Sequence, residues 1–233
     1  MSSQDRLADA AIALNRVLTE AGIRYGLVGG YPISLLGSAR TCKNVNCLAQ
    51  TSKDEIIVAL NGRDGFTRTL TNNERQDYAS FLWSDRIGWT QDWGRDAVLV
   101  EVFCEQFTGA QYSMQNVRIA SVTVNSRRAT GQAVSILDPF FQFKYMLRAA
   151  AYRNKLHDEF DLQWLSYYYR QVIAAGAQSL NYEIVGLALR NYASLDDRFA
   201  GAGIDVNYAK QCARGVRLDA VAVLGNVQRG ILG

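Results

Sequence analysis

The sequence predicts a mixed α/β domain at the N-terminus and a helical domain after it, and three observations support this division. An apolar run at 25–28 leads into two glycines and a helical pattern, and a second apolar run follows at 44–49. Residues 97–103 alternate between two kinds of side chain, which is typical of a strand with one buried face. From Asp138 onward the apolar residues recur only at helical spacing. We therefore expect an α/β domain over 1–137 and a helical domain over 138–233.

The remaining elements of the first domain are assigned in chain order. Residues 5–21 carry apolar side chains at helical spacing, and Gly22 follows the last of them. Residues 52–62 are expected to form a helix, because Ser52 and Glu55 have the spacing of a capping box. The other assignments are short strands and irregular loops at 66–96, a strand at 116–124 and a loop at 125–132.

The second domain opens with a clear helix start. Asp138 can cap the helix, and Pro139 follows at the position where proline costs least. One face of this helix collects apolar side chains, and another collects basic ones. The apolar face contains Phe140, Phe143, Leu147 and Ala151, and the basic side chains are Lys144, Arg148 and Lys155.

The composition argues against several classes of protein. The 233 residues include 25 basic and 22 acidic side chains, so the net charge of +3 is too small to prove a nucleic-acid partner. No apolar run approaches the roughly 18 residues of a membrane span, and the N-terminal stretch is not a signal peptide. We therefore expect a cytoplasmic protein without a membrane partner. Four cysteines without a CxxC pair, and a single histidine, argue against a zinc site.

Two adjacent glycines stand between the first strand and the next helix. Gly29 and Gly30 would let a ligand approach the backbone closely, and the helix that follows offers free N–H groups to an anion. Ser34, Ser38 and Arg40 could add hydroxyl and guanidinium donors. A tight turn with close packing explains the same two glycines without any ligand.

The spacing of the residues after the glycines carries a resemblance. Thirteen residues separate Gly30 from Asn44-Val45-Asn46, and a later strand carries Glu101. This arrangement resembles the nucleotidyltransferase fold family, in which two glycines, a helix and an Asp-x-Asp strand precede a third carboxylate on a neighbouring strand. The resemblance covers about residues 10–170 and implies a mixed sheet with flanking helices, followed by a helical half that contributes a lysine, here Lys144.

The two aspartates of that family pattern are asparagines in this chain. In the family, three carboxylates hold two divalent cations for phosphoryl transfer. The matching positions here are Asn44, Asn46 and Glu101, and a neutral amide is a weaker ligand for a hard cation. The resemblance therefore leaves open a magnesium-dependent nucleotidyltransferase in weakened or mutated form, a non-catalytic nucleotide-binding module, or another reaction in the same pocket.

A narrower resemblance rests on four segments: GSARTCKNVNCL at 37–48, NNERQDY at 72–78, LVEVF at 99–103 and LRAAAYRNKLHDEFDLQWL at 147–165. In these segments the chain is similar to a group of fungal proteins related to this fold, some of which are arginine-containing cyclodipeptide synthases. That resemblance implies a natural-product enzyme that joins arginine and a second amino acid from aminoacyl-tRNAs into a diketopiperazine. Aminoacyl transfer starts from an activated ester and needs no two-metal centre, so the expected cofactor is none.

The resemblances imply candidate roles for individual residues. Glu101 is the candidate for binding an arginine side chain or accepting a proton, and Ser38 is the first of four candidate nucleophiles, with Ser34, Cys42 and Cys47. The candidate substrate-binding residues are Gly29, Gly30, Ser34, Arg40, Asn44, Asn46 and Lys144, and the candidate RNA-binding residues are Arg127, Arg128, Arg148 and Lys155.

Each role has a structural alternative. Glu101 could be a solvated carboxylate, the two cysteines could be small core residues, and the basic residues could form a solvated face. Alternative carboxylates for the substrate are Asp77 and Asp96. We expect a structural role for Asp158 and Asp161 through pairing with Arg153 or Lys155, and a core position for Trp164, Tyr168 and Tyr169.

Overall fold

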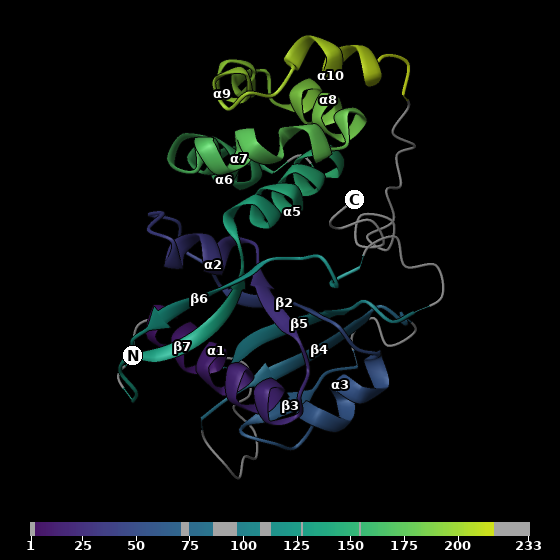
Figure 1. The fold of residues 1–233 in the computed structure, drawn as a ribbon. Helices are drawn as coiled ribbons and strands as arrows, with labels where there is room; N and C mark the ends of the chain where they lie inside the picture. The colour runs from purple at the N-terminus through teal and green to yellow at the C-terminus, as the bar shows by residue number, and fades with distance from the viewer. Residues whose placement is uncertain are drawn as a thin grey trace. The chain divides into compact units, whose positions relative to one another are not determined.

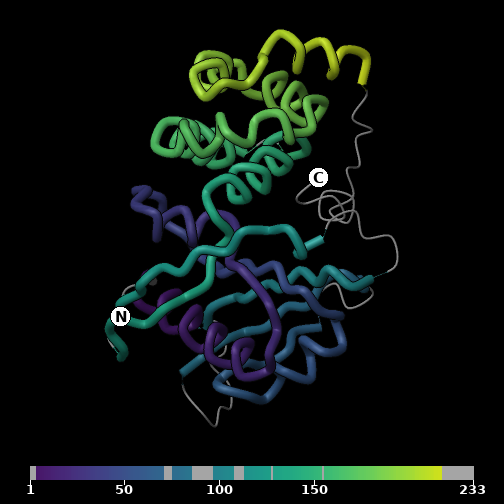
Figure 2. The backbone as a smooth tube through the Cα atoms, in the orientation of Figure 1, coloured from purple at the N-terminus to yellow at the C-terminus, as the bar shows by residue number. Residues whose placement is uncertain are grey.

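The structure is a computed structural model that describes residues 3–70, 75–85, 97–107, 113–126, 128–153 and 155–216 (Figure 1). The chain divides into two compact units, Met1–Leu137 and Asp138–Gly233. The first unit is built on a mixed sheet, and the second contains only helices in its described part. The chain passes from the first unit into the second after Leu137, as the backbone trace shows (Figure 2).

The first unit forms one mixed sheet of seven strands in its described residues. The strand order is β3-β4-β5-β2-β1-β7-β6, in which β1 pairs in parallel with β7 and β2 pairs in parallel with β5. This arrangement confirms the predicted fold class. The elements are α1 (Ser3–Glu20), β1 (Tyr25–Val28), α2 (Gly30–Leu35), β2 (Asn44–Ala49), α3 (Lys53–Leu60), β3 (Phe66–Arg68), β4 (Tyr78–Trp83), β5 (Val98–Cys104), β6 (Ile119–Val124) and β7 (Gln132–Leu137).

The main core of the first unit lies between the sheet and the helices α1 and α3. Alternate residues of each strand point to opposite faces of the sheet, and one set joins this core. On β2 these are Val45 and Cys47, and on β5 they are Val100 and Val102, all fully buried. The residues between them therefore point to the opposite face of the sheet.

Two predicted helix caps are confirmed. The Ser52 hydroxyl accepts a hydrogen bond from the Glu55 backbone N–H at 3.3 Å, and the Glu55 carboxylate accepts one from the Ser52 N–H at 3.0 Å. At the start of the second unit, the Asp138 carboxylate accepts from the Phe141 N–H at 3.0 Å. These contacts satisfy backbone donors that a helix leaves unpaired in its first turn.

Strand β7 was not among the predicted elements, and this is the main correction to the sequence-based assignment. The loop expected over 125–132 ends at Gln132, where β7 begins. The strand pairs antiparallel with β6 and in parallel with β1 at Leu27 and Ile136. One of its partner strands, β1, lies far away in the sequence, so its place in the sheet has no local signal. Strand β6 also begins later than predicted, at Ile119.

The second unit packs around its first helix. Helix α5 contacts α6, α7 and α8, and the Phe143 ring lies 5.4 Å from the Phe199 ring. Gly186 on α8 permits a close approach of α10, since a Cβ atom there would lie 2.0 Å from the Ala209 carbonyl oxygen. The helices are α5 (Pro139–Tyr152), α6 (Leu156–Tyr168), α7 (Arg170–Gly176), α8 (Tyr182–Asn191), α9 (Asp196–Gly201) and α10 (Val206–Cys212), with 3₁₀ turns at Ala177–Ser179 and Ala193–Leu195.

The helical prediction for the second unit is confirmed as far as residue 216, and 217–233 lie outside the described residues. Across the described ranges, no helix combines the length and apolar composition that crossing a bilayer requires.

Candidate functional site

The sheet brings together the three residues that match the carboxylates of the family pattern. Asn46 on β2 lies opposite Glu101 on the parallel strand β5, and Asn44 is two residues earlier on the same face. All three side chains point away from the core under α1, because Val45 and Val100 between them are buried there. The polar group therefore lies on the sheet face opposite α1.

Hydrogen bonds join this group into one array. The Asn44 amide nitrogen donates to Asn46 Oδ1 at 3.0 Å and to Glu101 Oε2 at 2.7 Å. The Tyr78 hydroxyl donates to Glu101 Oε1 at 2.8 Å. Both oxygens of the Glu101 carboxylate thus accept from neutral donors. We call Asn44, Asn46, Tyr78 and Glu101 the polar array.

Tyr78 is the member of the array that sequence reasoning missed. It begins β4 beside β5, and its ring packs 5.4 Å from the ring of Phe103. Burial raises the pKa of Tyr78 to about 12, and the neighbouring charge of Glu101 acts in the same direction. Tyr78 therefore stays protonated at neutral pH and remains a donor. The segment "NERQDY" drew attention to Asp77 as a carboxylate, whereas the tyrosine beside it reaches the array.

Asp77, an alternative carboxylate, has a partner of its own. Arg75 donates to both of its oxygens, at 3.0 and 2.5 Å, and the side chains of both residues are largely buried. The Arg75 guanidinium also lies 5.0 Å from the centre of the Tyr78 ring. This pairing gives Asp77 a structural role next to the array. The other alternative carboxylate, Asp96, lies outside the described residues.

Gly29 allows an unusual backbone conformation, and Gly30 allows close packing within the protein. Gly29 has φ +80°, a conformation that favours glycine, and it precedes α2. A Cβ atom on Gly30 would lie 2.5 Å from Arg40 Cζ and 2.8 Å from Cys42 Sγ. The close approach that Gly30 permits is therefore to a guanidinium and a thiol of the same chain, as in the close-packing alternative.

The candidate nucleophiles lack the features of an activated group. Ser38 is buried, and its hydroxyl accepts from the Arg40 backbone N–H at 3.4 Å, while Ser34 donates to the carbonyl of its own helix at Tyr31, 2.7 Å away. Burial raises the pKa of Cys42, and it raises that of the fully buried Cys47 well above its usual range. Reactive thiols have a lowered pKa and partial exposure. In the described ranges no general base bonds to Ser38, and its assignment as a nucleophile stays a prediction.

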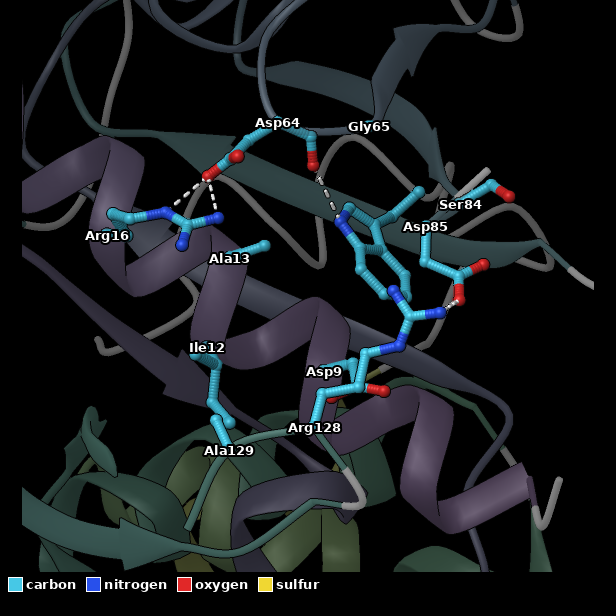
Figure 3. A pocket seen from close by; sticks show the side chains of 11 residues that line it. Asp9, Ile12, Ala13, Arg16, Asp64, Gly65, Ser84, Asp85, Arg128 and Ala129 are labelled. Atoms are coloured by element: carbon cyan, nitrogen blue, oxygen red, sulfur yellow. Dashed lines mark hydrogen bonds and ion pairs between the residues drawn. The ribbon is translucent and has the colours of Figure 1, made fainter. Parts of the chain in front are cut away.

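One of the candidate RNA-binding residues, Arg128, lies in the first unit beside a cavity of about 320 Å³ (Figure 3). Its guanidinium is exposed and forms an ion pair with Asp85. Arg127 lies outside the described residues. The candidate cations Lys144, Arg148 and Lys155 belong to the second unit, whereas the polar array is built by the first unit alone.

The cations of the second unit differ in exposure. Arg148 is buried, and its guanidinium lies 5.0 Å from the centre of the Tyr152 ring, so it is less suited to phosphate contact than the exposed Lys155. Lys144 is half-buried, lies 5.9 Å from the Phe141 ring and has a pKa lowered by burial.

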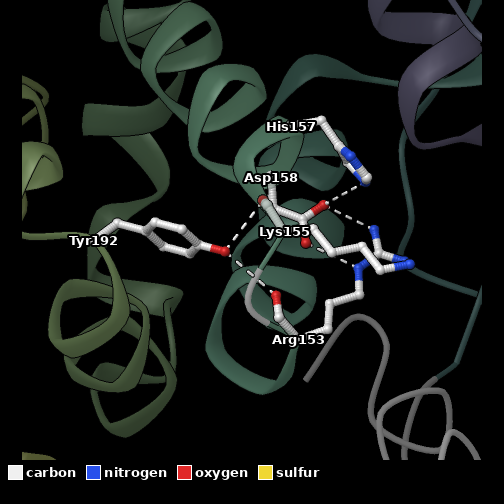
Figure 4. Close-up of polar contacts among 5 residues, drawn as sticks. All are labelled: Arg153, Lys155, His157, Asp158 and Tyr192. Atoms are coloured by element: carbon white, nitrogen blue, oxygen red, sulfur yellow. Dashed lines mark hydrogen bonds and ion pairs between the residues drawn. The ribbon is translucent and has the colours of Figure 1, made fainter.

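Asp158 has the structural role expected of it (Figure 4). Its carboxylate is 0% exposed and accepts two hydrogen bonds from Arg153, both at 2.9 Å. The Tyr192 hydroxyl donates to the backbone carbonyls of Arg153 at 3.3 Å and Lys155 at 3.1 Å. These contacts hold the turn between α5 and α6 against the end of α8.

The aromatic residues of α6 are not all in the core, which corrects another expectation. Tyr168 is 64% exposed, and its ring packs 4.9 Å from that of Trp164. Tyr169 lies 5.7 Å from Trp164. The helical spacing predicted that these rings lie together, but it did not predict which side of the helix faces solvent.

The donor set of the polar array does not fit a two-metal centre. In the described part of the chain, no group of three or more His, Cys, Asp or Glu side chains is placed to hold a metal ion. The array carries one carboxylate, and the amide nitrogen of Asn44 points at it. Magnesium prefers oxygen ligands with negative charge. In this arrangement the N–H₂ group of Asn44 binds the acceptors that a cation would otherwise bridge.

A solved structure of another protein shares the fold described above. A crystal structure of an antigenic nucleotidyltransferase-like protein from Paracoccidioides brasiliensis aligns with a TM-score of 0.60 and 18% identity, over 85% of this chain and 92% of that one. A tRNA nucleotidyltransferase complexed with a primer tRNA and an incoming ATP analogue aligns over 86% of this chain and 60% of that one, but at a TM-score of 0.30 and 12% identity. No protein-family profile and no curated protein sequence matches the chain. The fold is therefore that of nucleotidyltransferase-like proteins.

Proposed function

We propose that this protein is a transferase that uses aminoacyl-tRNAs, one of them charged with arginine, to form an arginine-containing cyclic dipeptide without a metal ion. The observation that carries the proposal is the polar array, which holds one carboxylate where the family pattern has three. At the positions of two metal-binding carboxylates, the chain places amides that are hydrogen-bonded to the remaining carboxylate. A site of this kind suits a reaction that moves no phosphoryl group.

The proposed reaction balances without an oxidant, a reductant or a metal. The α-amine of one aminoacyl-tRNA attacks the ester carbonyl of the other, a peptide bond forms, and the first tRNA leaves through its ribose hydroxyl. The free amine of the dipeptidyl-tRNA then attacks the second ester, which closes the ring and releases the second tRNA. In the first step the tRNA whose ester is attacked departs, and in the second step the tRNA that carries the dipeptide departs; each time the proton lost by the amine ends on the departing ribose oxygen. The protein has to position two amines and two carbonyls.

Glu101 has the chemistry to receive the arginine side chain. Each carboxylate oxygen has two acceptor positions, and the bonds from Asn44 and Tyr78 use one on each oxygen. The remaining positions can accept a bidentate guanidinium. Asn44 and Tyr78 would then fix the carboxylate in orientation. Glu101 could instead accept the amine proton, and the variants below separate these roles.

The loss of two negative charges also suits a polyanionic substrate. A tRNA terminus brings phosphates close to the aminoacyl ester, and carboxylates at positions 44 and 46 would repel them unless cations were bound. Asparagine removes that repulsion. The exposed Arg128 and Lys155 remain candidates for contact with the tRNA backbone.

The test is to express the chain in bacteria and analyse culture extracts by mass spectrometry against an empty-vector control. The expected result is a new mass that corresponds to a cyclic dipeptide of arginine and a second residue. Glu101→Gln keeps the side-chain shape and should abolish the product, whereas Glu183→Gln, at an exposed position on α8, should leave it unchanged. Soluble, folded protein that repeatedly yields no diketopiperazine would overturn the proposal.

The roles of Glu101 can be separated with Glu101→Asp, which keeps the charge but shortens the side chain. If Glu101 selects arginine, product from this variant should contain less arginine relative to other residues. If Glu101 is a general base, the amount of product should fall without a change in its composition. The ratio of cyclic dipeptides in the extract distinguishes the two outcomes.

A second candidate function is a magnesium-dependent nucleotidyltransferase in altered form. The observation that favours it is the strand register, which sets Asn46 opposite Glu101 with Asn44 on the same face. The double change Asn44→Asp and Asn46→Asp should then create magnesium-dependent nucleotide transfer. A double variant that gains neither metal nor nucleotide binding would reject this candidate. Nucleotide-induced thermal stabilisation of the unchanged protein without turnover would instead indicate a binding module.

A further inference from the structure

A cavity lies on the other face of the sheet, away from the polar array. This cavity of about 320 Å³ is lined by residues of α1, of the β3 region, of the end of β4 and of the loop between β6 and β7, all within the first unit (Figure 3). Trp83, one of its walls, belongs to the core under α1, whereas Glu101 points to the opposite face. The volume is at the lower end of the range found for small-molecule sites.

The charges around the cavity do not balance. Arg16 donates to Asp64 through Nε at 2.6 Å, and Arg128 forms an ion pair with Asp85. Within each of these two pairs, which lie at the two ends of the cavity, the positive and the negative charge neutralise each other. Asp9 is the remaining charged residue of the lining, and it leaves one negative charge over.

Asp9 is buried without a partner for one of its carboxylate oxygens. The residue is 6% exposed, and its Oδ2 atom is buried and has no hydrogen-bond partner. Burial of an ionised carboxylate is costly unless a partner compensates it. Since Asp9 lines the cavity, a cationic ligand that enters the cavity would lie beside its carboxylate and compensate its charge.

The other walls suit an apolar body. Ile12 and Ala13 line the same helix face as Asp9, and the Trp83 indole is fixed by a hydrogen bond from Nε1 to the Asp64 carbonyl at 2.9 Å. An indole that is held in place presents a flat surface against which an organic cation can pack. The site thus combines one buried anion with an apolar floor.

We propose that this cavity binds a small organic cation, whose ammonium or guanidinium group pairs with Asp9 and whose apolar part packs along Ile12 and Trp83. The proposal rests on the cavity and on the buried Asp9 carboxylate, one oxygen of which has no hydrogen-bond partner, and it does not depend on the reaction proposed for the polar array. The two sites use opposite faces of the sheet, so they can be tested separately.

The test uses three probes of nearly equal shape and different charge: phenethylamine, 2-phenylethanol and phenylacetate. Binding to the 233-residue protein is measured by the shift in melting temperature and by calorimetry. We expect saturable stabilisation by phenethylamine alone. Equal responses to the three probes, or no response to phenethylamine and to a second cation, phenylguanidine, would overturn the proposal.

Asp9→Asn provides a matched variant, with Asp54→Asn at an exposed position of α3 as the control. The Asp9 change should weaken phenethylamine binding about tenfold or more, and the control should not. Without a probe, Asp9→Asn should leave the melting temperature equal or higher, because it removes a buried charge that lacks a partner. Unchanged cation affinity in Asp9→Asn would assign the carboxylate no part in binding and overturn the proposal.

Discussion

Replacement of Asn44 by aspartate tests whether the amide truly takes the place of a cation in the polar array. In the structure, the Asn44 nitrogen donates to Glu101 Oε2 at 2.7 Å. Asn44→Asp turns this contact into two carboxylates that face each other. Two like charges about 4 Å apart repel each other by about 4 kcal/mol at the effective dielectric constant of a pair near the protein surface.

The net effect should be smaller than this Coulomb energy. Asn44 and Glu101 are both partly exposed, so solvent and salt screen the repulsion. We expect the free energy of unfolding at pH 7 to fall by about 1–3 kcal/mol, which corresponds to a drop in melting temperature of about 3–10 °C for a chain of this size. The drop should shrink at acidic pH, where one of the two carboxylates binds a proton.

The assay is thermal unfolding of Asn44→Asp with EDTA and with magnesium. Magnesium at 100 times its dissociation constant would restore about 2.7 kcal/mol. Asn207→Asp, at an exposed position of α10, is the matched control and should show neither the drop nor the magnesium effect. If Asn44→Asp unfolds at the same temperature as the unchanged protein in EDTA, the reasoning about the array is wrong.

Four further predictions concern stability. Tyr78→Phe should lower the free energy of unfolding by about 1 kcal/mol by loss of one hydrogen bond to a carboxylate. In the unchanged protein, phenolate absorbance should show Tyr78 titrating near pH 12. The contribution of its raised pKa to the free energy of unfolding should therefore be complete below about pH 10 and lost as the pH rises through 12. Arg153→Met should cost about 3–5 kcal/mol in denaturant unfolding, because it leaves the buried Asp158 carboxylate without its main partner, and a cost below 1 kcal/mol would contradict this. Gly186→Ala should lower the free energy of unfolding by about 1–3 kcal/mol, because the added Cβ forces α8 and α10 apart. Gly201→Ala, where a Cβ meets no atom within 4 Å, should be close to neutral. Equal effects of the two changes would show that helix packing is not the cause.

Much of the fold follows from local signals in the sequence. The capping box at Ser52 and the Asp138-Pro139 start are contacts within a few residues, and both lie where the sequence placed them. Strand β5 shows its alternation over seven residues and was recognised from it. Strand β7 has six residues, and its place beside β1 is set by pairing across the whole first unit. Sequence reasoning had no local feature from which to infer that pairing.

The candidate site was predictable in part for the same reason. The spacing within β2 put Asn44 and Asn46 on one face, and the family pattern supplied Glu101. Tyr78 joins them only because β4 pairs antiparallel with β5 in a register that places Ser80 opposite Glu101. A register cannot be read from one strand alone. The hydrogen bonds of the array, in which the Asn44 amide donates to two acceptors, likewise depend on side-chain geometry.

The position of β7 has a consequence for how the protein is made on the ribosome. Strand β1 leaves the ribosome early, but the parallel partner of Leu27, Ile136, is synthesised much later. At typical rates of synthesis this delay is on the order of 5–20 s. Until then one edge of β1 has no partner strand and is open to pairing with other chains. Since Asp138 caps the first helix of the second unit directly after β7, the first sheet cannot be complete before synthesis has reached the helical unit.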